Sequence, residues 1–155
     1  MDNNVFFSEL MSLLNKMEYQ TTMMKAEDLR IGESLRALVP VDEAGNNVLL
    51  EVMVIPYDED ALLIQIYTTL LTEIGPGYEA LKEMLLEWNL TCPIGAFGIY
   101  RREKQFYHKY NYLMPTDEDP KQMAMEIFYI IHLVMDVIAE LFPDAARLSG
   151  NVGKI

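Results

Sequence analysis

Between Tyr78 and Gly98 an amphipathic helix is followed at once by a glycine-punctuated strand, and this junction limits the folds open to the chain more than any other feature. The helix is indicated by apolar residues at spacings of three and four, with charged residues between them. Asn89 is predicted to end it, because asparagine tolerates left-handed backbone geometry and Pro93 follows soon after. The apolar positions of this helix are Tyr78, Leu81, Met84, Leu85 and Trp88.

Three strand-like segments precede the junction, at residues 35–41, 48–55 and 62–69. They are rich in aliphatic residues and are separated by short clusters of turn residues, which predicts an antiparallel meander. Pro40 lies inside the first segment and cannot donate a ladder hydrogen bond, so that segment is expected to be an edge strand or to end there. Residues 19–34 show no persistent period, and the sequence does not decide between helix and strand for them.

Further elements are predicted on both sides of these segments. Near the N-terminus, seven apolar residues from Phe6 to Met17 cover an arc of roughly 160° on a helical wheel, wider than a minimal amphipathic stripe. After the junction, residues 96–101 and 105–114 form a predicted hairpin. The last helix is expected to begin at Asp119–Pro120, a capping residue followed by one suited to the first turn, and to end at Pro143.

The resulting order is α-β-β-β-α-β-β-α, a single α+β domain in which helices pack against an antiparallel sheet. Its core is expected over roughly residues 5–143, with a loose tail at 149–155. A chain of 155 residues with about half of them apolar suits one domain with a substantial core. The last helix is apolar nearly all round, so beyond the sheet it needs a second contact, within the domain or across a subunit interface.

Charge and cysteine content narrow the possible partners and location. The net charge of −12 repels phosphate backbones, which argues against nucleic acid and suits a polypeptide partner. Cys92 is the single cysteine, so no internal disulfide can form. The first residues lack the positive charge of a signal peptide, and the longest apolar run, 127–142, is too short to span a bilayer. These features predict a soluble cytoplasmic protein that does not engage membranes.

A family resemblance depends mainly on two motifs. The leucine-rich helix Leu81–Asn89 ends in a Trp-Asn pair, and Gly95–Ile99 opens the strand that follows it. Together with the apolar terminal helix and the order of elements, they resemble the fold shared by type III secretion (Tir-type) chaperones and YbjN-like putative sensory-transduction regulators. The resemblance extends over roughly residues 6–142. The Trp-Asn pair is closer to the YbjN-like branch.

The resemblance implies a way of acting and two sets of residues. Members of the chaperone family are small acidic homodimers that hold an extended segment of a client protein, without nucleotide. Their second helix and following strand commonly form the dimer interface, while the client lies over the first helix and the sheet. The implied dimer interface is Leu85, Trp88, Phe97 and Ile99, and the implied client surface is Phe7, Met11, Leu14, Leu38 and Leu49. Each of these apolar residues also fits a plain core position.

No constellation in the sequence indicates catalysis, a cofactor or a metal. His132, Asp136 and Glu140 share a helical face, but no second cluster completes a metal site, and a solvated stripe explains them. Cys92 has no neighbouring motif that supplies a base. The basic and aromatic hairpin at 101–112 divides its aromatic residues between two sheet faces, which favours cross-strand packing over nucleic-acid binding. We therefore expect no enzyme activity.

Two functions are favoured by these features, ahead of a third, a structural role in a larger assembly. The first is a non-enzymatic, chaperone-like domain that holds or regulates a cytoplasmic protein partner through apolar surface of the first helix and the sheet. The second is a YbjN-like regulatory domain that binds a small ligand in a pocket between the sheet and a helix. The sequence does not name the client or the ligand.

Overall fold

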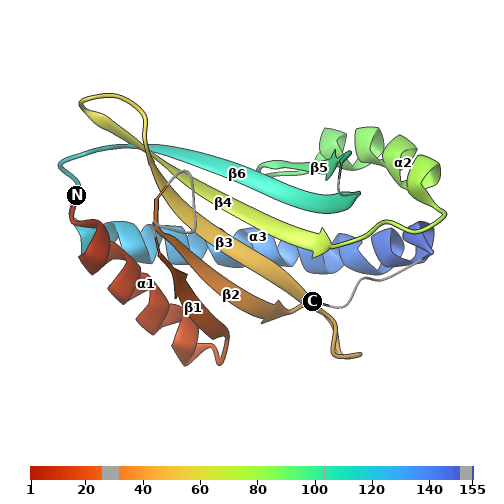
Figure 1. Ribbon diagram of the computed structural model, residues 1–155, viewed down its shortest axis with the longest axis horizontal. Helices are drawn as coiled ribbons and strands as arrows, with labels where there is room; N and C mark the ends of the chain where they lie inside the picture. The colour runs from red at the N-terminus through yellow and green to blue at the C-terminus, as the bar shows by residue number, and fades with distance from the viewer. Residues whose placement is uncertain (26–31, 103, 151–154) are drawn as a thin grey trace.

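A computed structural model describes residues 1–25, 32–102, 104–150 and 155 (Figure 1). The element order is α-β-β-β-β-α-β-β-α, which confirms the predicted α+β class and adds one strand. The elements are α1 (Asn3–Lys16), β1 (Gln20–Met24), β2 (Ser34–Pro40), β3 (Asn47–Pro56), β4 (Ala61–Leu71), α2 (Tyr78–Thr91), β5 (Ala96–Tyr100), β6 (Gln105–Pro115) and α3 (Pro120–Ser149).

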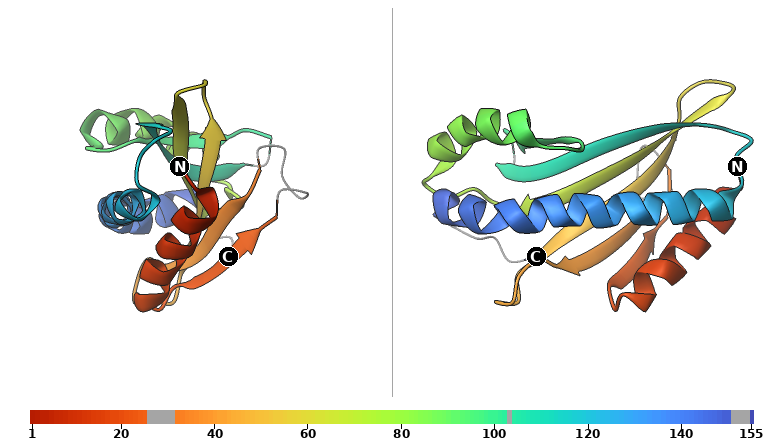
Figure 2. Two further views of the ribbon diagram at one scale, coloured as in Figure 1. Left: turned by 90° about the vertical axis from the view of Figure 1, so that its left-hand side faces the viewer. Right: turned by 180° about the vertical axis from the view of Figure 1, so that it is seen from behind.

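The strands form one antiparallel sheet in the order β1-β2-β3-β4-β6-β5. All three helices lie on the same face of it: α3 runs across the sheet, with α1 beside its first half and α2 at its other end (Figure 2). The strand register places Leu35, Ala37 and Val39 on this helix face, and the alternate residues of every strand on the opposite face. The fold is thus a two-layer sandwich of helices on one side of a sheet.

The core lies between the sheet and the helices. Aliphatic side chains from the helix face of the strands, including Leu50, Ile64 and Ile66, are fully buried beneath α3. The second contact that α3 needs is supplied largely within the domain, because α1 packs along it through fully buried Phe6 and Leu10. The wide apolar arc of α1 is accounted for by this double contact with the sheet and α3.

The prediction that Pro143 ends the last helix is wrong. The helix continues to Ser149 and ends at Gly150, whose φ of 69° provides the left-handed cap. Pro143 has no N–H to donate to the carbonyl of Ala139, four residues earlier in the helix. Both residues are exposed, so water can donate a hydrogen bond to that carbonyl instead. Ala145 and Ser149 beyond the proline are fully buried, and this packing favours continuation of the helix.

The C-terminal end of α3 is hydrogen-bonded to the turn that precedes α2. The Gly75 N–H donates to Ser149 Oγ at 3.1 Å, and the Gly77 N–H donates to the Ser149 carbonyl at 3.1 Å. A Cβ atom at Gly77 would overlap the Leu148 carbonyl oxygen, so only glycine permits this approach. Residues 149 and 150, predicted as tail, therefore belong to the folded domain.

The ambiguous segment 19–34 contains the additional strand, β1, which pairs with β2 from Gln20↔Leu38 to Met24↔Ser34. Residues 26–31 of that segment lie outside the described residues. The pairing of β1 with β2 stops at Leu38, and β2 ends two residues later, at Pro40. Of the two predicted alternatives, an edge strand or a strand end at Pro40, the structure has the strand end, because β2 is an interior strand. The sheet edge predicted near Pro40 is therefore formed by β1 instead.

Candidate functional site

The face of the sheet opposite the helices, which we call the open face, is covered by no helix of the described chain. Strand register arranges its side chains in rows that cross the sheet. One row runs Gln20, Leu38, Leu49, Thr69 and Tyr107; the next runs Thr22, Arg36, Glu51, Tyr67 and Lys109; at the far end Ile55, Leu63 and Leu113 form a third.

At one end of the open face, Leu38 and Leu49 face each other across β2 and β3 and are both half-buried. They line a shallow depression of about 410 Å³ together with Gln20, Thr22 and other residues of β1 and β2. The C-terminal residue, Ile155, also lines this depression. Arg36 Nε and Glu51 Oε1, 2.6 Å apart, form an ion pair in the neighbouring row. The depression is thus an apolar site that opens at the β1 edge of the sheet.

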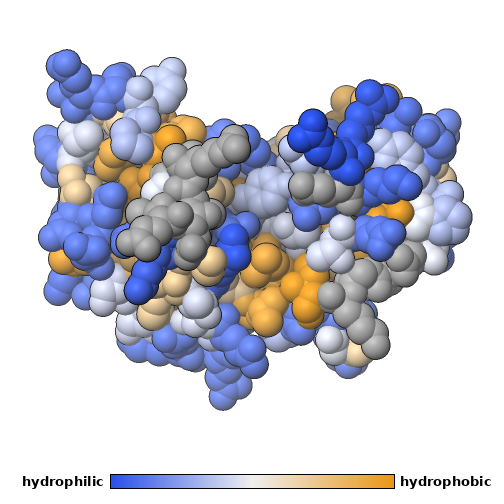
Figure 3. Space-filling model, viewed as in Figure 1, coloured by the Kyte–Doolittle hydropathy of each residue, from blue (hydrophilic) through white to orange (hydrophobic). Residues whose placement is uncertain are grey.

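Apolar side chains also gather elsewhere on the open face, where Leu113 is 56% exposed beside Leu63. Figure 3 shows this face with separate apolar areas between polar and aromatic surface. The Tyr67 and Tyr107 rings stack with centroids 4.9 Å apart, and Tyr107 lies over Gly98, where a Cβ atom would be 2.5 Å from the ring. Aromatic stacking thus occupies the middle of the surface, between its two apolar ends.

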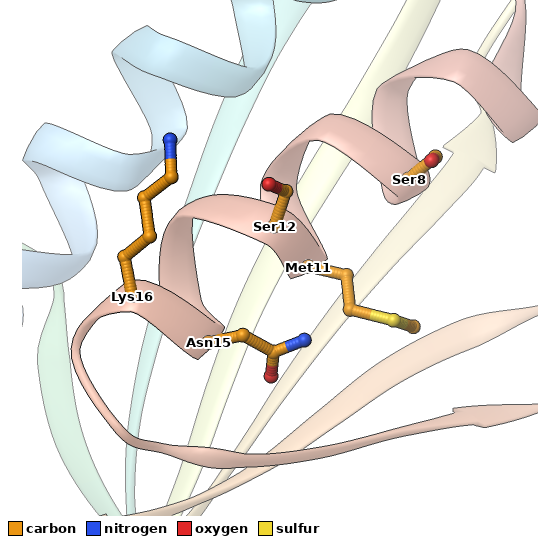
Figure 4. A pocket seen from close by; sticks show the side chains of 5 residues that line it. All are labelled: Ser8, Met11, Ser12, Asn15 and Lys16. Carbon is orange, nitrogen blue, oxygen red and sulfur yellow. The ribbon is translucent and has the colours of Figure 1, made fainter.

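The client residues predicted on the first helix do not form a surface. Phe7 is 3% exposed and Leu14 is fully buried, so both are core residues, which corrects their proposed role. Met11 is half-buried and borders a shallow depression that Ser8, Ser12, Asn15 and Lys16 complete (Figure 4). All five come from α1 alone, so this depression is one side of a helix and not a cleft between elements.

The predicted dimer residues face inward in the described chain. Phe97 is buried, and its ring stacks on Phe106 with centroids 5.7 Å apart; Trp88 contacts the same ring at 6.0 Å. Leu85 and Ile99 are half-buried against the core. These four residues hold α2 onto β5 and β6. The outer side of α2 instead displays Leu86 and Leu90, 75% and 79% exposed.

Asn89 has a role that the sequence interpretation missed. It lies inside α2, which continues to Thr91, so the prediction that it ends the helix is wrong. Its side-chain amide donates to the Phe97 carbonyl at 2.9 Å, and its Oδ1 accepts from the Phe97 N–H at 2.7 Å. One side chain thereby supplies the pair of hydrogen bonds that a neighbouring strand would make with one residue, Phe97, of the edge strand β5.

A groove lies between α2, α3 and the start of β5, with a volume of about 340 Å³. Trp88 and Phe97 form one wall, while Val137 and Leu141 of α3 face them. Its rim carries the carboxylates of Glu140 and Asp144 and the α2 C-terminal residues Thr91 and Cys92. The lining of this groove combines apolar and aromatic side chains with an equal share of polar surface, a mixture that can hold a small amphipathic ligand.

Cys92 lies close to a histidine, although nothing in the sequence spacing indicates it. Its Sγ is 4.0 Å from His108 Nε2, but both groups donate to the same acceptor, the Ile94 carbonyl, at 3.1 and 2.8 Å. The Nε2 nitrogen therefore holds a proton and cannot accept one from the thiol. Burial lowers the pKa of His108 and keeps the ring neutral. The pair lacks the base that an activated thiol needs.

The other polar candidates have structural roles. His132 Nδ1 lies 2.9 Å from the Phe128 carbonyl one turn earlier, a contact within the helix. Among the residues that the structure describes, no group of three histidine, cysteine or carboxylate side chains is placed to hold a metal ion. In the basic hairpin, Tyr107 lies on the open face and Phe106, Tyr110 and Tyr112 on the helix face, which confirms the predicted division of its aromatic residues.

Together these observations define a class of protein: a single α+β domain with one helix-covered and one open sheet face. Comparison with models of protein families finds no match, and comparison with curated proteins finds none either. No helix in the described ranges is long and apolar enough to cross a membrane.

Proposed function

We propose that this chain is a non-enzymatic, chaperone-like domain that holds an extended segment of a cytoplasmic protein partner on its open sheet face. The observation that carries the proposal is the Leu38–Leu49 depression, where two apolar side chains are left half-buried beside a sheet edge. Isolated half-exposed apolar residues are ordinary, but a paired set that forms a depression is typical of a contact surface.

The β1 edge supports an extended partner. Among the described residues, β1 has a strand neighbour on one side only, whereas β5 at the opposite edge is bonded by Asn89. A peptide added to β1 would gain main-chain hydrogen bonds, and its alternate side chains would reach the Leu38–Leu49 depression. The net charge of −12 favours a partner segment with basic residues.

The test is a mild pull-down of tagged protein from its native cytoplasm, with Leu38→Asp as the variant. Leu113→Asp is the matched control, since it adds the same charge to the same face outside the depression. We expect one protein at near-stoichiometric yield with the parent chain and the control, and its loss with Leu38→Asp, while all three melting curves coincide. Equal capture by both variants, or capture of nothing by the parent chain, would contradict the proposal.

A homodimer is part of the same proposal, with α2 as its contact. Because the inner side of α2 packs on Phe97 and Phe106, the available surface is the outer side, at Leu86 and Leu90. Light scattering that returns a monomer mass throughout the micromolar range would reject the dimer without affecting the proposed peptide site.

A regulatory domain that binds a small ligand is the second candidate function. The groove between α2 and α3 favours it, because the apolar walls and polar rim lie between a helix pair and the sheet. A thermal-shift screen against metabolites and metal ions tests it, and a screen without any stabilising compound would count against it.

A further inference from the structure

The groove between α2 and α3 has a chemistry specific enough to indicate a class of ligand. Its interior is apolar and partly aromatic, since Trp88 and Phe97 come from one side and Val137 and Leu141 from the other. A volume of about 340 Å³ accommodates a molecule of the size of one aromatic ring with a short substituent. The interior therefore suits a compact hydrophobic body.

The rim of the groove is negative. Glu140 and Asp144 lie one turn apart on α3, and both line the opening. Asp144 accepts a hydrogen bond from the exposed Arg147 at 3.1 Å, while no lysine or arginine in the described chain lines the groove. A ligand at this opening thus meets two carboxylates, only one of which has a basic partner there.

The end of α2 adds to this negative potential. Thr91 and Cys92 place the C-terminal end of the helix on the groove, where the last carbonyls accept no backbone hydrogen bond of the helix. Within the described helix, only the Trp88 carbonyl accepts a side-chain hydrogen bond, from Thr91 Oγ1 at 3.4 Å. The last turn of α2 carries no basic residue that would offset the helix dipole. The backbone and the α3 side chains therefore favour positive charge at the same position.

The single tryptophan completes the arrangement. Trp88 is half-buried and lines the groove on the side opposite the α3 carboxylates. A cation near an indole face gains a further electrostatic attraction, stronger for tryptophan than for other aromatic side chains. An indole, two carboxylates and a helix C-terminus together are the groups that recognise an organic ammonium ion.

We infer that the groove between α2 and α3 binds a small organic cation, an ammonium group carried on an aromatic or aliphatic body. The body lies against Val137 and Leu141, and the ammonium group lies between the indole of Trp88 and the carboxylates of Glu140 and Asp144. The inference rests on the second candidate function, a small-ligand site in this groove, and names its ligand class. The groove shares no residue with the Leu38–Leu49 depression, so failure of either proposal would not affect the other.

The experiment uses benzyltrimethylammonium as the probe, on the full chain. Equilibrium dialysis measures the amount bound, and the fluorescence of Trp88, the only tryptophan, reports whether the probe is in the groove. Phenylacetate and benzyl alcohol are anionic and neutral compounds of similar size. We expect saturable binding of the cation in the low millimolar range or tighter, with a change in Trp88 emission, and at least tenfold weaker binding of the other two.

Two double variants separate the groove from the overall charge of the protein. Glu140→Gln with Asp144→Asn removes the rim carboxylates, and Glu43→Gln with Glu59→Gln removes two exposed carboxylates from turns outside the groove. We expect the rim variant to weaken binding at least tenfold and the control variant to weaken it less than twofold. Equal losses in the two variants, equal binding of phenylacetate, or no cation retained in dialysis would overturn the inference.

Discussion

The two faces of the sheet are built from the same strands yet have opposite characters. On the helix face of β3, Val48, Leu50 and Val52 are fully buried beneath the helices. On the open face, their immediate neighbours Leu49 and Glu51 are half-buried, and one of them is charged. The comparison teaches that one face supplies most of the buried area that stabilises the fold, so side chains on the other face can change with less loss of stability.

The largest effect is expected when the neighbouring residues Leu49 and Leu50, one on each face, are changed separately to alanine. Leu50→Ala removes a fully buried side chain and should cost about 2–5 kcal/mol of unfolding free energy through lost burial and a cavity. Leu49→Ala, one residue earlier on the open face, should cost less than about 1 kcal/mol. Urea unfolding followed by circular dichroism measures both, and similar costs would show that the faces do not differ as described.

On the helix face, Asn89 of α2 is hydrogen-bonded to the edge strand β5. Asn89→Ala tests this contact, and its expected effect on stability is smaller than that of Leu50→Ala. The change removes both hydrogen bonds to the Phe97 backbone and should destabilise the domain by about 1–3 kcal/mol. Asn89→Asp is the matched control, because it keeps the acceptor for the Phe97 N–H and loses only the donor. Hydrogen exchange at β5 should be faster in the alanine variant than in the aspartate variant; unchanged protection in both would contradict the role assigned to Asn89.

The smallest expected effect concerns acid sensitivity of the helix face. His108 is buried there, and its Nδ1 and the Oγ1 of the opposite Thr68 are buried without hydrogen-bond partners among the described residues. Burial lowers the pKa of His108, so the unfolded chain binds a proton that the folded chain does not. Stability should therefore be complete above the unfolded pKa of about 6.5 and should decrease as pH falls below it.

Replacement of each histidine separates this effect from general acid destabilisation. In His108→Phe, the decrease in unfolding free energy between about pH 7.5 and about pH 5.5, one unit above and one below the reference pKa, should be smaller than in the parent chain, as measured by urea titration at each pH. His132→Gln removes the other histidine and controls for the loss of one. An equal decrease in the parent chain and His108→Phe would contradict the assignment to His108.

The sequence was sufficient for the elements whose burial alternates clearly, and it failed where burial is irregular. The strands around Leu50 and Ile64 were predicted because their apolar residues fill one face. Strand β1, Gln20–Met24, contains no fully buried residue, so it left no periodic signal. Its position in the sheet comes from pairing with β2, a tertiary contact that composition does not reveal.

The site could be predicted only in part, for a similar reason. Leu38 and Leu49 lie opposite each other on one sheet face, and their role in client binding stays a prediction. Phe7 and Leu14 are buried instead, because a helical wheel cannot show that α1 packs against both the sheet and α3.

The length of α3 bears on how the mass of this protein must be measured. Thirty helical residues extend for about 45 Å, whereas a spherical protein of 155 residues has a radius of gyration near 15 Å and a diameter of about 39 Å. One helix is thus longer than the sphere, and the molecule is elongated (Figure 1). An elongated monomer elutes early from a sizing column and imitates a dimer, so only a shape-independent mass can decide the oligomeric state.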